Sequence, residues 1–569
     1  MSASKTQYEK FDLYRCASLA LNYLTSMVDR QEDYLPYWLI HVTTYPAWAR
    51  HCRVDDAELV ASWHTGLACV REILNTSEGE GVQAGFKRHL YKHWGKCGLR
   101  YHAAYPWTHT IHHAFHEDAY ILTALNAIIE REGDKRAGQL AAKLVRGLRR
   151  LVYERKVRTF WSGDYPYEEP IYEFPNDVYI KGVGFDFTRQ TGRGEQSIRN
   201  GMMLHALVRH YQITGDSVSL DLATGIANHL LGSSRYFNYR GEFFGHVHSA
   251  VWVASGLVLL GRLAGTERYI LFGKMIHDYV KSLSSSFGWV PEFAQWHPMS
   301  EEHCETCCVK DMIECGFELI DAGYEENYDL INRYVRNQLY EQQIKDGSFV
   351  GVDNDRKATE PGVTFKDMDK RVVGGWSGGG EPNSISLTRF RSLAGCCAGI
   401  APQALHKVWQ RTVERRGRQI YVNFPIDIRT PEATVCSGYP NEGRLAVTVA
   451  RSGDYRIRTH PFMGGHISLT VNERRRPILW DGDCLVVDGA KKGDTIVLRH
   501  PLHQEVVEET VRGTTFRVTW RGCDVVNMSP PGNPLMLYQR VAGVPKQTPP
   551  PPGSTTHPAV RALPTEQKR

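Results

Sequence analysis

The chain has 569 residues, and its content of 42% hydrophobic and 23% charged residues is that of an ordinary globular protein. Because single hydrophobic cores stop growing near about 250–300 residues, two or more domains are expected. The net charge is only +5 and the basic residues are spread out, which excludes the concentrated basic stripe of a nucleic-acid-binding protein.

The N-terminal segment begins Met-Ser-Ala-Ser-Lys-Thr-Gln and lacks the apolar run of a signal peptide. No stretch of the chain approaches the ~18 apolar residues that a membrane span needs. The sequence therefore predicts a cytoplasmic protein with reduced thiols and no membrane partner. Its scattered cysteines do not suggest a disulfide framework.

Paired helices are predicted over roughly the first 400 residues, from a pattern that repeats along the chain. In each pair an amphipathic segment ends in a short turn that contains glycine, and a second amphipathic segment follows. The glycine suits the left-handed residue that closes a helix. The pairs span residues 119–152, 202–231, 251–283 and 310–339 and turn at 132–134, 214–216, 264–266 and 322–324.

The connections between these pairs are long and of unequal length. Unequal spacing argues against an open solenoid, and loops longer than about 12–15 residues in a compact domain usually carry function. The sequence therefore predicts that residues 1–412 form a closed α/α toroid with its site at the end that carries the loops.

The pattern changes after residue 412 to short segments in which apolar and polar residues alternate, separated by Gly, Asp, Asn and Pro. Residues 413–543 are predicted to form an antiparallel β-sandwich. The Pro-rich residues 544–569 are predicted to be a disordered tail. The strand segments begin at residues 420, 445, 455, 467, 495 and 515.

Two short cysteine-rich segments carry the strongest chemical signal. Glu305 and Cys307 lie in Glu-His-Cys-Glu-Thr-Cys-Cys, and Cys396 and Cys397 are adjacent further along the chain. One carboxylate and three thiolates suit zinc and disfavour Mg²⁺ and Ca²⁺. Spacing alone leaves two alternatives open: the thiols are buried core residues, or Cys304-x-x-Cys307 forms a structural all-cysteine site.

Together these features resemble the β-L-arabinofuranosidases of glycoside hydrolase family 127. Helical hairpins come first, then Glu305-Thr306-Cys307, then Cys396-Cys397, and then a β-sandwich. The resemblance implies an (α/α)6 barrel followed by a β-sandwich. The chain resembles a distant member, because Cys-Cys-Ala-Gly stands where the family has Cys-Cys-Pro-Pro. Supporting matches lie at Gly201, 214–216, 245–246, 420–423 and 469–472.

The resemblance also implies roles for individual residues. Glu305, Cys307, Cys396 and Cys397 would bind Zn²⁺, with Cys304 and Cys308 as additional thiols whose share in the metal stays open. Cys396 would be the nucleophile of a retaining glycosidase that releases a terminal β-L-arabinofuranose or a similar small sugar. Glu292, in Pro-Glu-Phe, is the nearest match to the general acid/base, with Glu301 and Glu302 as alternatives.

Four further residues are candidates for sugar binding. His246 and His248 open the third helical pair and could hydrogen-bond sugar hydroxyls. Trp289 and Trp376 could offer aromatic faces to sugar C–H groups, as could Trp296 beside Glu292. The histidines at positions 109, 112, 113 and 116 lack the His-Glu-x-x-His pattern, so a structural or loop role is favoured there over a second metal.

Two other functions remain open on the sequence alone. One is a polysaccharide lyase or sugar epimerase on an α/α barrel, with a Tyr/His pair at the sugar and a structural zinc. The other is a carbohydrate-binding protein with a degenerate site. The expected partner in each case is an oligosaccharide or glycoside, and a homodimer is left open.

Overall fold

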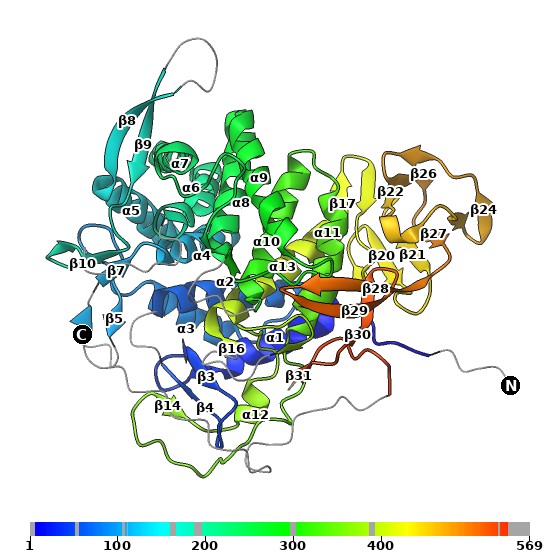
Figure 1. The fold of residues 1–569 in the computed structure, drawn as a ribbon, viewed down its shortest axis with the longest axis horizontal. Coiled ribbons are helices and arrows are strands. Elements are labelled where there is room, and N and C mark those ends of the chain that lie inside the picture. The colour runs from blue at the N-terminus through cyan, green and yellow to red at the C-terminus, as the bar shows by residue number, and fades with distance from the viewer. Residues whose placement is uncertain are drawn as a thin grey trace.

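The computed structural model describes residues 6–51, 56–104, 109–110, 112–159, 167–186, 196–295, 303–385, 393–532 and 535–543. Its main body is a ring of paired helices (Figure 1). Six inner helices follow one another around the ring, and the last packs against the first, which closes it. In ring order these are α2 (Asp56–Leu74), α4 (Glu117–Glu132), α6 (Leu204–Thr214), α8 (Val247–Ala264), α10 (Thr306–Asp321) and α13 (Gly395–Thr412).

An outer helix packs on each inner helix. The contacts confirm the α/α toroid, and the six pairs within the described residues match the (α/α)6 barrel implied by the resemblance. α8 is apolar and long enough to cross a membrane, but it is an inner helix with 83% of its apolar window buried. The outer helices are α1 (Leu13–Ser26), α3 (Glu80–Leu90), α5 (Lys135–Leu151), α7 (Ser217–Asn228), α9 (Glu267–Leu283) and α11 (Asn327–Tyr334).

Glycine turns form the predicted hairpins. Gly133, Gly215 and Gly265 close α4, α6 and α8 with φ values of 62°, 73° and 63°, the left-handed region in which a side chain is strained. The next residue caps the following helix in two of the pairs: the carboxylates of Asp134 and Asp216 accept from backbone N–H groups of α5 and α7. Neighbouring residues in the sequence therefore determine where each hairpin turns back.

All six inner helices run in the same direction. In each pair the outer helix carries the chain back, so the next inner helix starts again at the same end of the ring. Short strands occupy this end and hold the loops. β12 (Gly245–His246) pairs with β13 (Phe293–Ala294), and β16 (Leu393–Ala394) leads directly into α13. The N-termini of the inner helices are therefore brought together.

A β-sandwich follows the ring, and β17 begins at the residue after α13 ends. Its two sheets enclose a separate apolar core that includes Val422, Val447 and Leu498. The pairings are antiparallel except for β18 with β22, which run parallel. One sheet contains β17 (Val413–Arg416), β18 (Gln419–Val422), β22 (Gly453–Arg458), β26 (Cys484–Ala490) and β25 (Trp480–Asp481); the other contains β19 (Ile428–Arg429), β20 (Ala433–Ser437), β21 (Arg444–Val449), β27 (Thr495–Arg499), β23 (Ser468–Val471) and β24 (Arg474–Arg476).

A third sheet joins the two parts. It contains β28 (Gln504–Val511), β29 (Thr514–Arg521) and β30 (Asp524–Ser529), drawn in orange in Figure 1. The sequence assigned the segment at 515 to the sandwich, but Phe516 and Val518 pack into the core of the helical ring. Alternation reveals that a strand has one apolar face, but it does not reveal what that face will contact.

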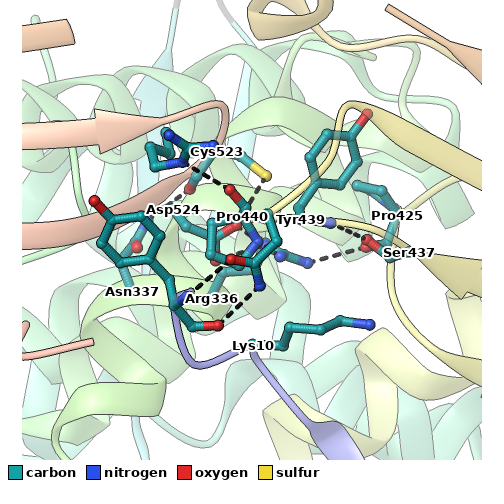
Figure 2. Close-up of polar contacts among 12 residues, drawn as sticks. Lys10, Arg336, Asn337, Pro425, Ser437, Tyr439, Pro440, Cys523 and Asp524 are labelled. Carbon is teal, nitrogen blue, oxygen red and sulfur yellow. Dashed lines mark hydrogen bonds and ion pairs between the residues drawn. The ribbon is translucent and has the colours of Figure 1, made fainter. Parts of the chain in front are cut away.

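A buried ionic network fixes this third sheet to the ring (Figure 2). Nη2 of Arg336 lies 2.7 Å from Oδ2 of Asp524, and Nη1 of Arg540 lies 2.9 Å from Oδ1 of the same carboxylate. Arg540 also donates to Glu341 at 2.8 Å. Arg336 belongs to a helical turn that follows α11, whereas Asp524 begins β30, so one carboxylate neutralises guanidinium groups from two separate segments.

We expect Asp524→Asn to lower the free energy of unfolding by about 3–5 kcal/mol, because it leaves Arg336 buried without its counter-charge and leaves Arg540 with Glu341 alone. Urea unfolding followed by circular dichroism measures the loss. Asp481→Asn is the matched control, since Asp481 is 55% exposed in its ion pair with Arg456 and should change stability by less than about 1 kcal/mol. Equal effects of the two changes would contradict the importance given to the network.

Candidate active site

The first turns of α10 and α13 bring together the four donors that the sequence singled out. Sγ of Cys307 lies 3.3 Å from Sγ of Cys397, and Oε1 of Glu305 lies 3.4 Å from Sγ of Cys396 and 3.9 Å from Sγ of Cys397. One donor atom from each residue lies within 4.8 Å of all the others. These four side chains could hold a single metal ion.

Tight packing places the cysteine pair at the start of α13. A Cβ on Gly395 would lie 2.7 Å from a methyl group of Leu59 and 3.2 Å from a ring carbon of Trp38, so the backbone packs closely against these side chains. The carbonyl of Gly395 accepts a hydrogen bond from the indole of Trp63 at 2.7 Å. The inner helix α2 therefore fixes the turn that carries Cys396 and Cys397.

A Gly-rich loop, residues 374–380, fixes the start of α10 in a similar way. Cys304 and Gly380 exchange two backbone hydrogen bonds, of 2.6 and 2.8 Å. The hydroxyl of Thr306 donates to the carbonyl of Ser377 at 2.6 Å. The Glu305-Thr306-Cys307 segment is thus held in place on both sides of Glu305.

The donor set is chemically suited to a cation. Burial raises the pKa of Cys307 well above its ordinary value, and the neighbouring sulfurs of Cys396 and Cys397 raise it further. Three thiolates and a carboxylate at these distances repel one another, so a positive charge among them is needed for all to be ionised. The types of donor and their spacing therefore fit a metal site.

The surroundings of Glu305 favour the ionised carboxylate that a metal ligand needs. Burial alone would raise the pKa of its carboxyl, but His246 and the more distant His248 lower it to about 2. Nε2 of His246 lies 3.5 Å from Oε2 of Glu305. The carboxylate is therefore charged at neutral pH, as a metal ligand must be.

Glu292 lies beside this set. Donor atoms of His246, Glu292 and Glu305 all lie within 4.8 Å of one another. The pairing of β12 with β13 explains this geometry, because the N–H of Val247 donates to the carbonyl of Glu292 at 2.9 Å. The side chain of Glu292 is 16% exposed and lies 3.5 Å from Nε2 of His303. The site therefore has a partly accessible carboxyl group next to the sulfur cluster.

His248 lies behind His246 and is buried. Its Nε2 lies 2.9 Å from the hydroxyl of Tyr120, and its Nδ1 contacts Oδ2 of Asp311. Burial opposes protonation, but the charge of Asp311 raises the pKa of His248 to about 9. Both ring nitrogens are engaged within the protein, so the structure gives His248 a supporting position rather than a sugar-facing one.

Neither predicted tryptophan faces the site. Trp289 is 0% exposed and Trp376 is 1% exposed. Their indole N–H groups donate to the carbonyls of Gly380 and Leu339, both at 2.9 Å. Both rings anchor the Gly-rich loop and are buried, so neither presents a face to a sugar. Trp296 lies outside the described residues.

Some of the remaining candidate residues are described in the structure, and others lie outside the described residues. Sγ of Cys304 lies 3.6 Å from the backbone carbonyl of Glu305 and 3.9 Å from Oε1 of Gln342, and within the described part of the chain neither Cys304 nor Cys308 joins the four-donor group. Among the clustered histidines, His113 pairs with Asp118 at 3.0 Å in the core. Glu301, Glu302 and the side chain of His109 lie outside the described residues.

The sequence reasoning missed three residues of the site. Tyr120 and Asp311 occupy interior positions of amphipathic helices, and only ring closure brings them to His248. His303 contacts Glu292 from within the Glu-His-Cys-Glu motif, and this proximity to the motif was the available signal.

Comparisons with known proteins give a fold. A scan against protein-family models finds no match, and a search of curated proteins finds none either. Among solved structures, a family 127 β-L-arabinofuranosidase from Geobacillus stearothermophilus T6 matches with a TM-score of 0.58 and 16% identity, over 92% of this chain and 86% of that one. A second family 127 β-arabinofuranosidase matches with a TM-score of 0.59 and 15% identity, over 91% of this chain and 83% of that one. The chain therefore has the fold of the family 127 arabinofuranosidases, an (α/α)6 barrel followed by a β-sandwich.

Proposed function

We propose that this protein is a retaining glycoside hydrolase in which Cys396 is the nucleophile and Glu292 is the general acid/base. The observation that carries the proposal is that two groups of donor atoms share Glu305. One is the sulfur cluster, and the other contains Glu292 and His246. A nucleophile and a carboxylic acid close together are what a retaining mechanism requires.

The donor set of Glu305, Cys307, Cys396 and Cys397 would hold Zn²⁺, which binds carboxylate and thiolate ligands. Bound zinc would supply the positive charge that keeps the sulfur of Cys396 deprotonated near neutral pH. His246 would keep Glu305 ionised and in place, since its ring lies against that carboxylate. It also offers hydrogen-bonding capacity to a sugar hydroxyl.

In the first step Sγ of Cys396 forms a bond to the anomeric carbon as the bond to the leaving oxygen breaks. Glu292 gives its proton to that oxygen. In the second step Glu292 takes a proton from water, whose oxygen displaces the sulfur and restores the thiolate. The contact of His303 with Glu292 places a group that can stabilise the carboxylate formed between the two steps.

The sugar is proposed to be a terminal β-L-arabinofuranose or a sugar of similar size. Support comes from the fold shared with two proteins that are named as arabinofuranosidases. A lyase or epimerase is less well supported, because Tyr120 and His248 bond to each other and are buried, with 4% and 3% of their surface exposed. That pair is therefore not available to a sugar carbon.

We expect a β-L-arabinofuranosyl trap with a good leaving group to add one glycosyl unit to Cys396. Intact-mass and peptide mass spectrometry locate the adduct, and Cys396→Ser should give none. An adduct on another residue would reject the nucleophile. Turnover of other glycosides without any adduct from this trap would reject the sugar and leave the nucleophile to be tested with the glycoside that is cleaved.

A further inference from the structure

A cavity lies inside the helical ring, lined by His205 and Trp252 near the starts of α6 and α8 and by later residues of α2, α4 and α13. Its volume is about 450 Å³, within the usual range of small-molecule pockets. Every inner helix contributes to its wall, and polar side chains predominate. They include Cys69 of α2, Arg131 of α4, His205 of α6, Trp252 of α8, Lys310 of α10 and His406 of α13.

Four of the lining residues form a cluster around one sulfur. Cys69 is hydrogen-bonded to His406, and Nη2 of Arg131 lies 3.7 Å from Sγ of Cys69. Nε2 of His406 lies 3.0 Å from Oε2 of Glu72, which Arg131 also contacts at 3.1 Å. A thiol, an imidazole and a carboxylate thus lie together, and an imidazole beside a thiol is what activates a cysteine nucleophile.

The charges around Cys69 favour the thiolate. Burial alone would raise the pKa of Cys69, but His406 and Arg131 outweigh it and lower the pKa below its ordinary value. In turn, burial would lower the pKa of His406, but the charge of Cys69 raises it to about 9. These opposite shifts favour transfer of the thiol proton of Cys69 to the imidazole of His406.

Other charged groups also line the cavity, and they do not reverse the preference of Cys69 for the thiolate. Arg209 pairs with Glu130 at 2.6 Å, and Lys310 pairs with Glu314. The groups that face Cys69 from the packed helices are Glu72 on α2, Glu130 and Arg131 on α4, His205 and Arg209 on α6, Lys310 and Glu314 on α10, and His406 and Lys407 on α13.

Other buried cysteines of the chain behave in the opposite way. Burial raises the pKa of Cys16 to about 12 and that of Cys315 well above its ordinary value, as expected for thiols that serve only as small apolar residues. Cys69 is just as buried, with 4% of its surface exposed, yet it lines a cavity and has a cationic partner. Packing alone does not explain this environment.

We propose that Cys69 is the nucleophile of a second reactive site, and that this cavity takes a small organic electrophile that becomes bonded to its sulfur. Sγ of Cys69 forms the bond to the electrophilic carbon, and the leaving group departs with the electron pair of the bond that breaks. The proton of the thiol goes to the imidazole of His406. Glu72 positions the imidazole, and Arg131 places an N–H group beside the sulfur.

Iodoacetamide is a suitable probe, with peptide mass spectrometry to measure the rate at Cys69 between pH 6 and 9. In the folded protein we expect the rate between pH 7 and 9 to rise less steeply than in the unfolded protein, because the pKa of Cys69 is lowered. In the protein unfolded in urea, the rate at the same residue should rise about tenfold per pH unit up to about pH 8.5. A rate that follows the same pH dependence in the folded and unfolded protein would overturn the proposal, as would the absence of any adduct in the folded protein.

His406→Gln should slow the reaction at pH 7 about tenfold and restore the steeper rise with pH. Glu72→Gln should slow it less, about threefold, and gives a second measurement if the first variant does not fold. The matched control is His205→Gln, which changes another histidine of the same cavity, one that contacts Glu318 at 3.5 Å, and should leave the rate within about twofold. Equal effects at His205 and His406 would reject the pair. Cys69→Ser should retain glycoside turnover, so this test is independent of the function proposed above.

Discussion

Glu292→Gln should lower kcat/KM by about 10²–10⁴ on glycosides with alkyl leaving groups and by about tenfold or less on activated aryl glycosides. An alkoxide is a poor leaving group and needs the proton that Glu292 supplies, whereas an activated phenolate leaves without it. The glutamine keeps the size and the hydrogen-bonding capacity of the side chain but has no proton to transfer. Steady-state kinetics on matched pairs of substrates measure the difference.

A second loop carboxylate serves as the control. Glu381 also lies in a loop of the ring and accepts a hydrogen bond from Ser384 at 2.6 Å, but it belongs to neither donor group in the described residues. Glu381→Gln should therefore leave both substrate types within about threefold of the parent protein. Equal losses on both substrates for Glu292→Gln would remove it from the acid/base role and direct attention to Glu301 and Glu302.

Purified protein should contain one zinc per chain, and Cys307→Ala or Cys397→Ala should lose most of it. Each change removes one of four donors whose sulfur and oxygen atoms lie within 4.8 Å of one another, close enough for one ion to bind them all. A site with three remaining ligands binds the metal far more weakly. Elemental analysis after dialysis against a weak chelator measures the occupancy, and turnover should fall in parallel with it.

Cys304→Ala is the deciding control for this metal site. Cys304 belongs to the same motif and is equally buried, but its sulfur lies against the backbone carbonyl of Glu305 and the amide of Gln342 and belongs to neither donor group in the described residues. The variant should keep its zinc. If Cys304→Ala loses the metal while Cys397→Ala keeps it, the structural all-cysteine site is correct and the proposed nucleophile loses its basis.

Local signals allowed much of the fold to be predicted from the sequence. The turns at Gly133, Gly215 and Gly265 depend only on neighbouring residues, and each one closes a helix as expected. By contrast, the destination of an apolar strand face depends on distant segments, and this is why Phe516 was assigned to the sandwich although it packs against the ring. Periodicity identifies a buried face but not its partner.

The candidate site shows the same difference between local signals and contacts that depend on distant segments. Glu305, Cys307, Cys396 and Cys397 could be found because rare residue types stand close together in the sequence. The partners of His248 could not, since a tyrosine or an aspartate inside an amphipathic helix looks like any other core or surface residue. The tryptophans gave the opposite difficulty: an aromatic residue near a site has the same sequence signal whether its ring is open to a ligand or packed behind a loop.

The common direction of the six inner helices gives the ring two electrically unlike ends. Each helix carries a partial positive charge at its first turn and a partial negative charge at its last, worth about 0.3–1 kcal/mol to a neighbouring ion of opposite sign. Glu305 stands at the N-cap of α10, and α4 begins with Glu117 and Asp118. At the opposite end, arginine occupies the last turn of four inner helices: Arg71 in α2, Arg131 in α4, Arg262 in α8 and Arg411 in α13. The backbone itself thus favours anionic donors at the end where the sulfur cluster lies, and basic side chains at the other.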